Sequence, residues 1–174
     1  MDRRKFIISG LAFGGMLAAP NFISPSDHQK DKNLSFFVHS TGEREAVTYW
    51  SGGNYLSDGV AAINRPLRDY KTDIVGSIDV NLLDILHSML MSSDDYYELE
   101  VVRGHIAVDA RDPFVPDSPD AFHNAGRAID IRARGVGLGH LVEEFVRWFD
   151  GGIGIYPKKN FVHLDLGPSR RWIG

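Results

Sequence analysis

Two short segments in the last third of the chain alternate in side-chain character, and this alternation constrains the fold most. In residues 126–133 one face carries Ile129, Ile131 and Ala133, and the other carries Ala128, Asp130 and Arg132. In residues 160–166 one face carries Val162, Leu164 and Leu166, and the other carries Phe161, His163 and Asp165. Successive side chains of a β-strand point to opposite faces of a sheet. Both segments are therefore predicted to be strands with one apolar face.

Polar residues on the second face of these strands form a candidate metal site. Asp130 points away from its apolar neighbours, His163 shares a face with Asp165, and His123 precedes the first strand. Two imidazoles and one carboxylate are a frequent ligand set for catalytic Zn²⁺, which keeps a fourth position open for water. The set His123, Asp130 and His163 therefore suggests a zinc hydrolase. The spacing leaves a second interpretation open, in which the three are ordinary structural residues that never meet.

The rest of the chain indicates an α+β fold. Residues 34–50 are predicted to form a β-hairpin, residues 97–104 a strand, and residues 57–71, 80–92 and 138–149 helices. A loop with Pro113, Pro116 and Pro119 follows the strand at 97–104 and is expected to border the site. The expected architecture is a mostly antiparallel sheet with flanking helices.

Four ordered motifs carry a resemblance to a known family. They are His-x-x-Gly-x-Ala-x-Asp at 123–130, Gly-Gly-Ile-Gly-Ile-Tyr-Pro at 151–157, Asn-Phe-Val-His-Leu-Asp at 160–165 and Gly-Pro-Ser-Arg-Arg-Trp at 167–172. Together they resemble the zinc peptidases of the D-alanyl-D-alanine carboxypeptidase and murein endopeptidase superfamily, above all its MepK-like (YcbK-like) branch. The resemblance covers residues 120–172 and extends more weakly to about residue 34.

This resemblance implies a fold, a cofactor and a reaction. The fold would be hedgehog/D-Ala-D-Ala-peptidase-like, and His123, Asp130 and His163 would bind Zn²⁺. The chain would hydrolyse peptide cross-links or stem peptides of bacterial peptidoglycan, as an endopeptidase rather than a carboxypeptidase. Its expected partners are peptidoglycan peptides.

The general base is the first point at which the chain departs from the family pattern. Many relatives carry an acidic residue three positions before the last His ligand, where this chain has Asn160. An amide cannot accept a proton, so Asp165 is the nearest alternative carboxylate. It would act either as the base or as a hydrogen-bond partner that orients His163.

The second departure from the family pattern concerns the side chains that bind the substrate or stabilise developing negative charge. Relatives carry a Ser-Gly-Tyr-Arg type motif where this chain reads Val-Arg-Gly-His-Ile at 102–106. Arg103 and His105 are the candidate replacements, and Arg103 as a solvated charge is the alternative. Tyr156 either donates a hydrogen bond to an oxyanion or packs beside Pro157. These departures leave a second function open, a catalytically altered zinc-containing module that binds cell-wall peptides.

The N-terminus predicts export. Arg3 and Arg4, followed by Phe6 and an apolar stretch to Ala19, look like a twin-arginine signal, and a basic cluster before a membrane anchor is the alternative. We expect a signal segment at 1–19, a polar tether at 20–33 and a zinc peptidase-like domain at 34–174. The chain would meet the twin-arginine export machinery, would contact a membrane only through an uncleaved signal, and would act in the periplasm or cell envelope. Its net charge of −4 gives no indication of a nucleic-acid surface.

Overall fold

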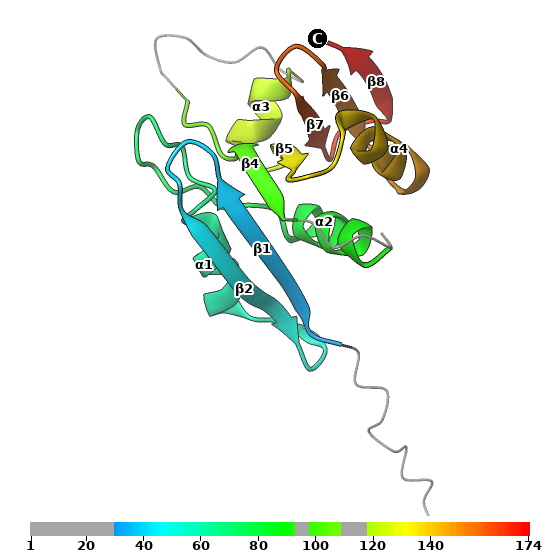
Figure 1. Cartoon of the computed structure of the whole chain (residues 1–174). Coiled ribbons are helices and arrows are strands. Elements are labelled where there is room, and N and C mark those ends of the chain that lie inside the picture. The colour runs from blue at the N-terminus through cyan, green and yellow to red at the C-terminus, as the bar shows by residue number, and fades with distance from the viewer. Residues whose placement is uncertain (1–29, 93–97, 109–117) are drawn as a thin grey trace, which may run out of the picture.

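The computed structural model describes residues 30–92, 98–108 and 118–174 (Figure 1). Within these ranges the helices are α1 Ser57–Asn64, α2 Val80–Ser92, α3 Pro119–Asn124 and α4 Leu138–Trp148. The strands are β1 Lys32–Val38, β2 Arg44–Ser51, β3 Asn54–Tyr55, β4 Leu99–Arg103, β5 Ala128–Ala133, β6 Gly152–Tyr156, β7 Phe161–Asp165 and β8 Arg170–Ile173.

The strands form one mostly antiparallel sheet, as predicted. Their order across the sheet is β3-β2-β1-β4-β5-β7-β6-β8. β1 pairs with β4 in parallel, as β6 does with β8, and the other neighbours are antiparallel. The predicted α+β class is therefore confirmed. β5 and β7 lie side by side, which places Asp130 directly opposite His163.

The predicted faces of β5 and β7 are confirmed by the contacts of their side chains, although both faces are buried. Ile129, Ile131, Val162 and Leu164 are at most 1% exposed and belong to the main hydrophobic cluster. α2 and α4 contribute Leu82, Leu86 and Phe145 to the same cluster, so these helices cover the apolar face of the sheet. The second face of β5 and β7 is left for polar side chains, and α3 packs on this part of the sheet.

Several predicted boundaries differ from the structure, most of them by one or two residues. The helix expected at 57–71 ends at Asn64, because Pro66 lacks the N–H that would continue the hydrogen-bond ladder. β1 begins at Lys32, two residues before the start of the predicted hairpin. The predicted signal segment 1–19 and most of the predicted proline-rich loop lie outside the described residues. In the part of the chain that the structure describes, no helix has the length and apolar character needed to cross a membrane.

α3 is a short helix that was not predicted from the sequence, and both of its ends are capped. Ser118 accepts a hydrogen bond from the backbone N–H of Ala121, and Pro119 occupies the first turn. At the other end Gly126 adopts φ +67°. The N–H groups of Gly126 and Arg127 donate to the carbonyls of His123 and Phe122, which forms a Schellman motif. These caps hold the helix that carries His123.

A polar cluster around Asp84 ties α2 to the N-terminal strands. The carboxylate accepts hydrogen bonds from Lys32 (2.8 Å), Tyr49 (2.9 Å) and Tyr55 (2.7 Å). Burial opposes ionisation, but these three donors outweigh it and lower the pKa of Asp84 below its ordinary value. The ionised carboxylate is therefore part of the folded structure.

We expect Asp84→Asn to lower the free energy of unfolding at pH 7 by about 1–2 kcal/mol, because charge-assisted hydrogen bonds are lost. The folded-state pKa lies below the unfolded value of about 3.9, so this stabilisation is present above that pH and is lost as the pH falls through the folded-state pKa. Urea unfolding of both proteins at pH 7 and near pH 3 measures the difference. An equal difference at the two pH values would contradict this role.

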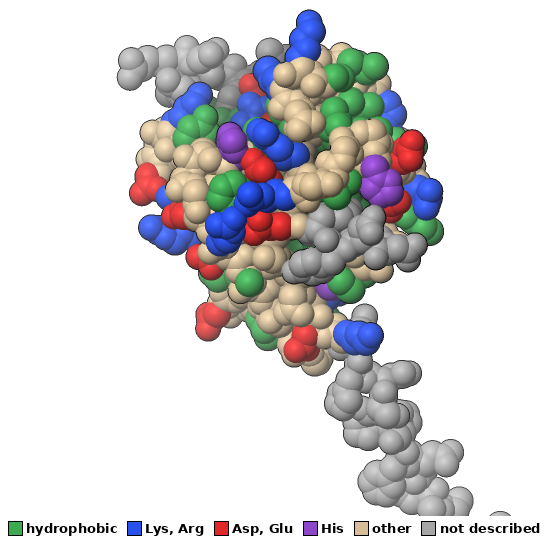
Figure 2. All heavy atoms as spheres, in the orientation of Figure 1, with side chains coloured by type: hydrophobic (Ala, Val, Ile, Leu, Met, Phe, Trp, Pro, Cys, Tyr) green, Lys and Arg blue, Asp and Glu red, His purple; other side chains and the backbone are tan. Residues whose placement is uncertain are grey.

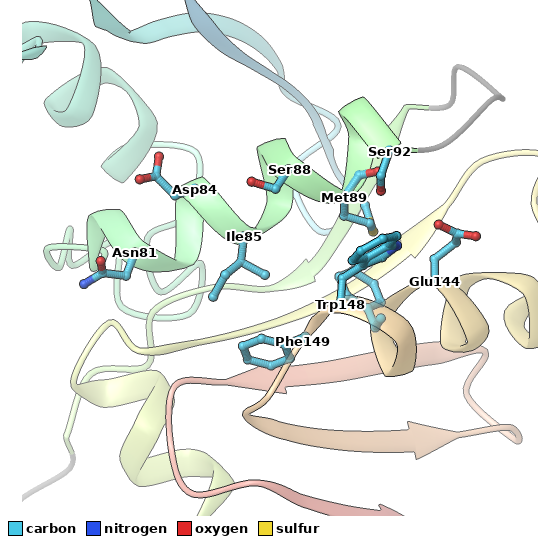
Figure 3. Close-up of a pocket in the computed structure, with 10 residues that line it drawn as sticks. Asn81, Asp84, Ile85, Ser88, Met89, Ser92, Glu144, Trp148 and Phe149 are labelled. Carbon is cyan, nitrogen blue, oxygen red and sulfur yellow. The ribbon is translucent and has the colours of Figure 1, made fainter. Parts of the chain in front are cut away.

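A groove lies between α2 and α4, with a volume of about 480 Å³. Figure 3 shows Ile85 and Met89 of α2 facing Trp148 and Phe149, while Asp84 points away from Phe149. None of the residues that line this groove is a candidate zinc ligand. The candidate zinc ligands therefore lie outside this groove.

Candidate metal centre

His123, Asp130 and His163 converge at one point between α3, β5 and β7. One ligand atom from each lies within 4.8 Å of the other two. Nε2 of His123 lies 3.2 Å from Nδ1 of His163, and Oδ1 of Asp130 lies 3.1 Å and 2.7 Å from these two nitrogens. All three residues are buried, at no more than 1% exposure. The structure therefore brings together the three predicted ligands.

Hydrogen bonds on the far side of each imidazole determine which nitrogen carries the proton. Nδ1 of His123 donates to the carbonyl oxygen of Gly104 at 2.6 Å, and Nε2 of His163 donates to Asp165 at 3.1 Å. A carbonyl and a carboxylate only accept, so in the neutral rings the protons sit on these outer nitrogens. The inner nitrogens consequently point lone pairs at each other and at Asp130.

Three lone-pair atoms in contact repel one another unless a proton or a metal cation lies among them. Ligand atoms around a tetrahedral zinc ion, with bonds of about 2.0–2.1 Å, are about 3.3 Å apart. The separations in this group, 2.7–3.2 Å, approach that value. Two imidazole nitrogens and a carboxylate oxygen are also a donor set that zinc prefers. The donor set and its spacing fit a zinc ion.

The pKa values of the group reflect the same arrangement. Burial lowers the pKa of His123 and keeps the ring neutral, although Asp130 acts in the opposite direction. For His163 burial also lowers the pKa, but Asp130 and Asp165 together raise it. Burial of Asp130 is outweighed by hydrogen bonds with both imidazoles and by the charge of Arg103, so its pKa lies far below the ordinary value. The ionised Asp130 therefore favours a cation between its carboxylate and the two imidazoles.

Asp165 is fixed on the outer side of His163. Arg170 donates to both of its oxygens, to Oδ1 at 3.0 Å and to Oδ2 at 2.8 Å. The backbone N–H of Gly167 donates to Oδ1 at 2.8 Å. The side chain is 0% exposed. Asp165 thus lies on the side of the His163 ring that faces away from Asp130. Arg170 holds it there, and this arginine was not predicted as a site residue from the sequence.

Glycines of β6 make room for these contacts. Gly152 lies between Asp165 of β7 and Arg170 of β8, and Gly154 lies between His163 and Trp172. A Cβ on Gly152 would meet the carboxylate of Asp165, and one on Gly154 would meet the ring of Trp172. Glycine at these two positions therefore lets side chains of β7 and β8 reach each other across β6.

A β-bulge brings Arg103 to the metal site. β4 pairs Val101 with Ile131, but Arg103, and not Val102, lies opposite Asp130. The extra residue reverses the face that Arg103 would otherwise occupy. Nε of Arg103 donates to Oδ2 of Asp130 at 2.9 Å, and Nη1 donates to Asp120 at 3.0 Å. Arg103 therefore holds the oxygen of Asp130 that faces away from the imidazoles.

A cavity of about 480 Å³ opens in front of Asp130. Its wall combines charged and aromatic side chains, and it is lined by Tyr70, Val102, Arg103, Ser118, Pro119, Asp120, Asp130, Tyr156, Lys159 and Phe161. Asp130 is the candidate ligand that reaches this wall. Asp120 and Lys159 also line the cavity, and neither belongs to a motif from which candidate residues were predicted.

The remaining predicted residues lie in different places. Tyr156 lines the cavity, stacks on Phe161, and accepts a hydrogen bond from Trp172 at 3.2 Å. His105 does not line the cavity, and its buried ring packs against Gly76. Asn160 is exposed in the β6–β7 turn with φ +54°, a conformation that asparagine tolerates better than most residues.

The sheet and its converging His–Asp–His group define a candidate metallopeptidase. The model of the M15 peptidase family described as peptidoglycan L,D-endopeptidase MepK matches residues 26–172, so the chain belongs to this family. Similar proteins include peptidoglycan L,D-endopeptidase MepK of Escherichia coli strain K12, 28% identical over 177 residues that cover 98% of this chain and 97% of that protein. Probable peptidoglycan L,D-endopeptidase MepK of Haemophilus influenzae is 26% identical over 179 residues, covering 99% and 96%. No solved structure gives a significant match.

Proposed function

We propose that this protein is a zinc-dependent endopeptidase that hydrolyses peptide cross-links or stem peptides of bacterial peptidoglycan. The observation that carries the proposal is the convergence of three lone-pair atoms beside a cavity, in a chain of this peptidase family. His123, Asp130 and His163 would hold the metal. A bound zinc ion supplies an activated water at neutral pH and polarises the scissile carbonyl.

The proposed roles of Asp165 and Arg103 are to position the ligands. Asp165 accepts the outer N–H of His163, and Arg170 and Gly167 hold both of its oxygens, so it orients the imidazole. Because its oxygens are occupied and it lies behind the ring, Asp165 does not serve as the base in this proposal. Arg103 orients Asp130 by donating a hydrogen bond to its Oδ2.

We assign the proton acceptor to Asp120. It lies three residues before His123 on α3, so the two side chains share a helix face. Asp120 also lines the cavity, and Arg103 holds one of its oxygens at 3.0 Å. Its side chain is 49% exposed, so its second oxygen is accessible to a proton from water in the cavity. Tyr156 lines the same cavity and can donate its O–H to an oxyanion, since its oxygen is the acceptor from Trp172.

The place of action that we propose is the bacterial envelope. The names of the relatives refer to peptidoglycan, which lies outside the cytoplasm. Export by the twin-arginine machinery follows from Arg3, Arg4 and the apolar stretch after them. Figure 2 shows Lys and Arg side chains interspersed with Asp and Glu on one face of the molecule, so this face has no uniform charge.

Metal removal tests the proposed function. We expect a chelator to abolish hydrolysis of cross-linked muropeptides by the purified chain, and added Zn²⁺ but not Mg²⁺ to restore it. Product release followed by chromatography measures the rate, and elemental analysis gives the zinc content. Undiminished hydrolysis by metal-free protein would sink the proposal. Tight muropeptide binding without hydrolysis by zinc-loaded protein would instead identify a peptide-binding module.

A further inference from the structure

The turn between β6 and β7 presents a lysine to the cavity. Tyr156 pairs with Phe161, so the intervening residues 157–160 close the hairpin. The N–H of Lys159 donates to the carbonyl of Tyr156 at 3.1 Å, and the N–H of Asn160 donates to that of Pro157 at 3.3 Å. This tight turn places Lys159 on the cavity wall, whereas the neighbouring Lys158, which is also exposed, does not line the cavity.

Lys159 differs from the other charged residues of the cavity in its ion pairs. Arg103 is neutralised by Asp120 and Asp130, at 3.0 Å and 2.9 Å. No carboxylate among residues 30–92, 98–108 and 118–174 forms a salt bridge with Lys159, and its ammonium lies 5.9 Å from the ring centre of Tyr156. On the cavity wall, Lys159 is thus a cation that forms no ion pair with the described carboxylates.

We propose that Lys159 forms a carboxylate-binding subsite, so that the protein selects peptides with a free carboxylate close to the scissile bond. This inference rests on the proposed function and names its substrate class. The free carboxylate would complement the ammonium of Lys159, whereas the guanidinium of Arg103 is already bound to Asp120 and Asp130. A cavity of about 480 Å³ has room for the residues on either side of one peptide bond.

The test compares two substrates and three variants. One substrate is a cross-linked muropeptide with its free carboxylates, and the other is the same muropeptide with those groups converted to carboxamides. We expect wild-type kcat/KM to be about tenfold higher for the carboxylate form, since a tenfold preference corresponds to about 1.4 kcal/mol. Lys159→Gln should remove this preference through a rise in KM with kcat unchanged.

Two matched variants separate the subsite from a general charge effect. Lys158→Gln removes the same charge one residue away and should keep the preference. Lys159→Arg keeps a cation at the position and should retain most of it. Because Lys159 is exposed, each variant should fold and bind zinc like the wild type, which circular dichroism and elemental analysis verify.

Two results overturn the inference and leave the proposed function intact. They are equal wild-type hydrolysis of the two substrates, and a Lys159→Gln variant that keeps the wild-type preference. A wild-type protein that is loaded with zinc and hydrolyses neither substrate removes the proposed function, and this inference with it.

Discussion

Asp130→Asn should abolish both stoichiometric zinc binding and peptide hydrolysis. The carboxylate is the anionic member of the candidate ligand set, and its Oδ1 contacts both ligand nitrogens at 2.7 and 3.1 Å. An amide of the same shape fills the space but carries no negative charge. Since a bound metal supplies several kcal/mol of transition-state stabilisation, kcat/KM should fall by about 10³-fold or more. Elemental analysis and muropeptide hydrolysis measure the two effects.

Asp84→Asn is the matched control for this experiment. The exchange is chemically identical, but Asp84 bonds to Lys32, Tyr49 and Tyr55 and does not line the cavity. It should lose some stability and keep its zinc and its activity. An Asp130→Asn variant that is folded, binds one zinc ion per chain and hydrolyses substrate at the wild-type rate would exclude this residue as a ligand.

The sequence was sufficient to predict which side chains of β5 and β7 point away from the apolar core, but not that the two strands pair. Alternation is a local property, and the apolar residues of each strand can only face the core. Once the two strands are neighbours, Asp130 and His163 must lie on the same face. His123 was included in the candidate set because it precedes the first strand, but the direction of its side chain could not be predicted, because the helix that carries it was not predicted.

α3 was missed although its signals are present in the sequence. Ser118 followed by Pro119 is a typical helix start, and Gly126 is a typical residue after a helix end. The helix has only six residues, and no apolar period can develop over that length. The capping residues are therefore the only signal of this helix, and Pro119 was assigned to the preceding loop and Gly126 to the following strand.

Two other features of the site have no local signal. The bulge that turns Arg103 toward Asp130 depends on how β4 pairs with β5, which single-sequence alternation cannot show. Arg170 reaches Asp165 from β8 across Gly152, and this contact exists only in the assembled sheet. For this reason Asp165 could be read as either a base or a positioning residue from the sequence.

Asp120→Asn should lower kcat by about 10²- to 10⁴-fold while zinc binding is retained, the range expected when a general base is removed. Asp120 contacts none of the candidate ligand atoms, so the metal set is left complete. An asparagine can still accept a hydrogen bond from Arg103, which keeps the cavity wall in place. What the variant loses is the ability to take a proton. Steady-state hydrolysis and elemental analysis of the same preparation measure both properties.

Asp165→Asn separates a proton acceptor from a positioning residue. This variant weakens the hydrogen bond to His163 and the ion pair with Arg170, so zinc affinity should fall by about 10- to 100-fold. Its activity should recover when zinc is supplied in excess, because the ligands themselves remain. Asp120→Asn should not recover at any zinc concentration. If the two variants behave in the opposite way, with Asp165→Asn inactive at saturating zinc and Asp120→Asn active, then Asp165 is the base and Asp120 only balances the charge of Arg103.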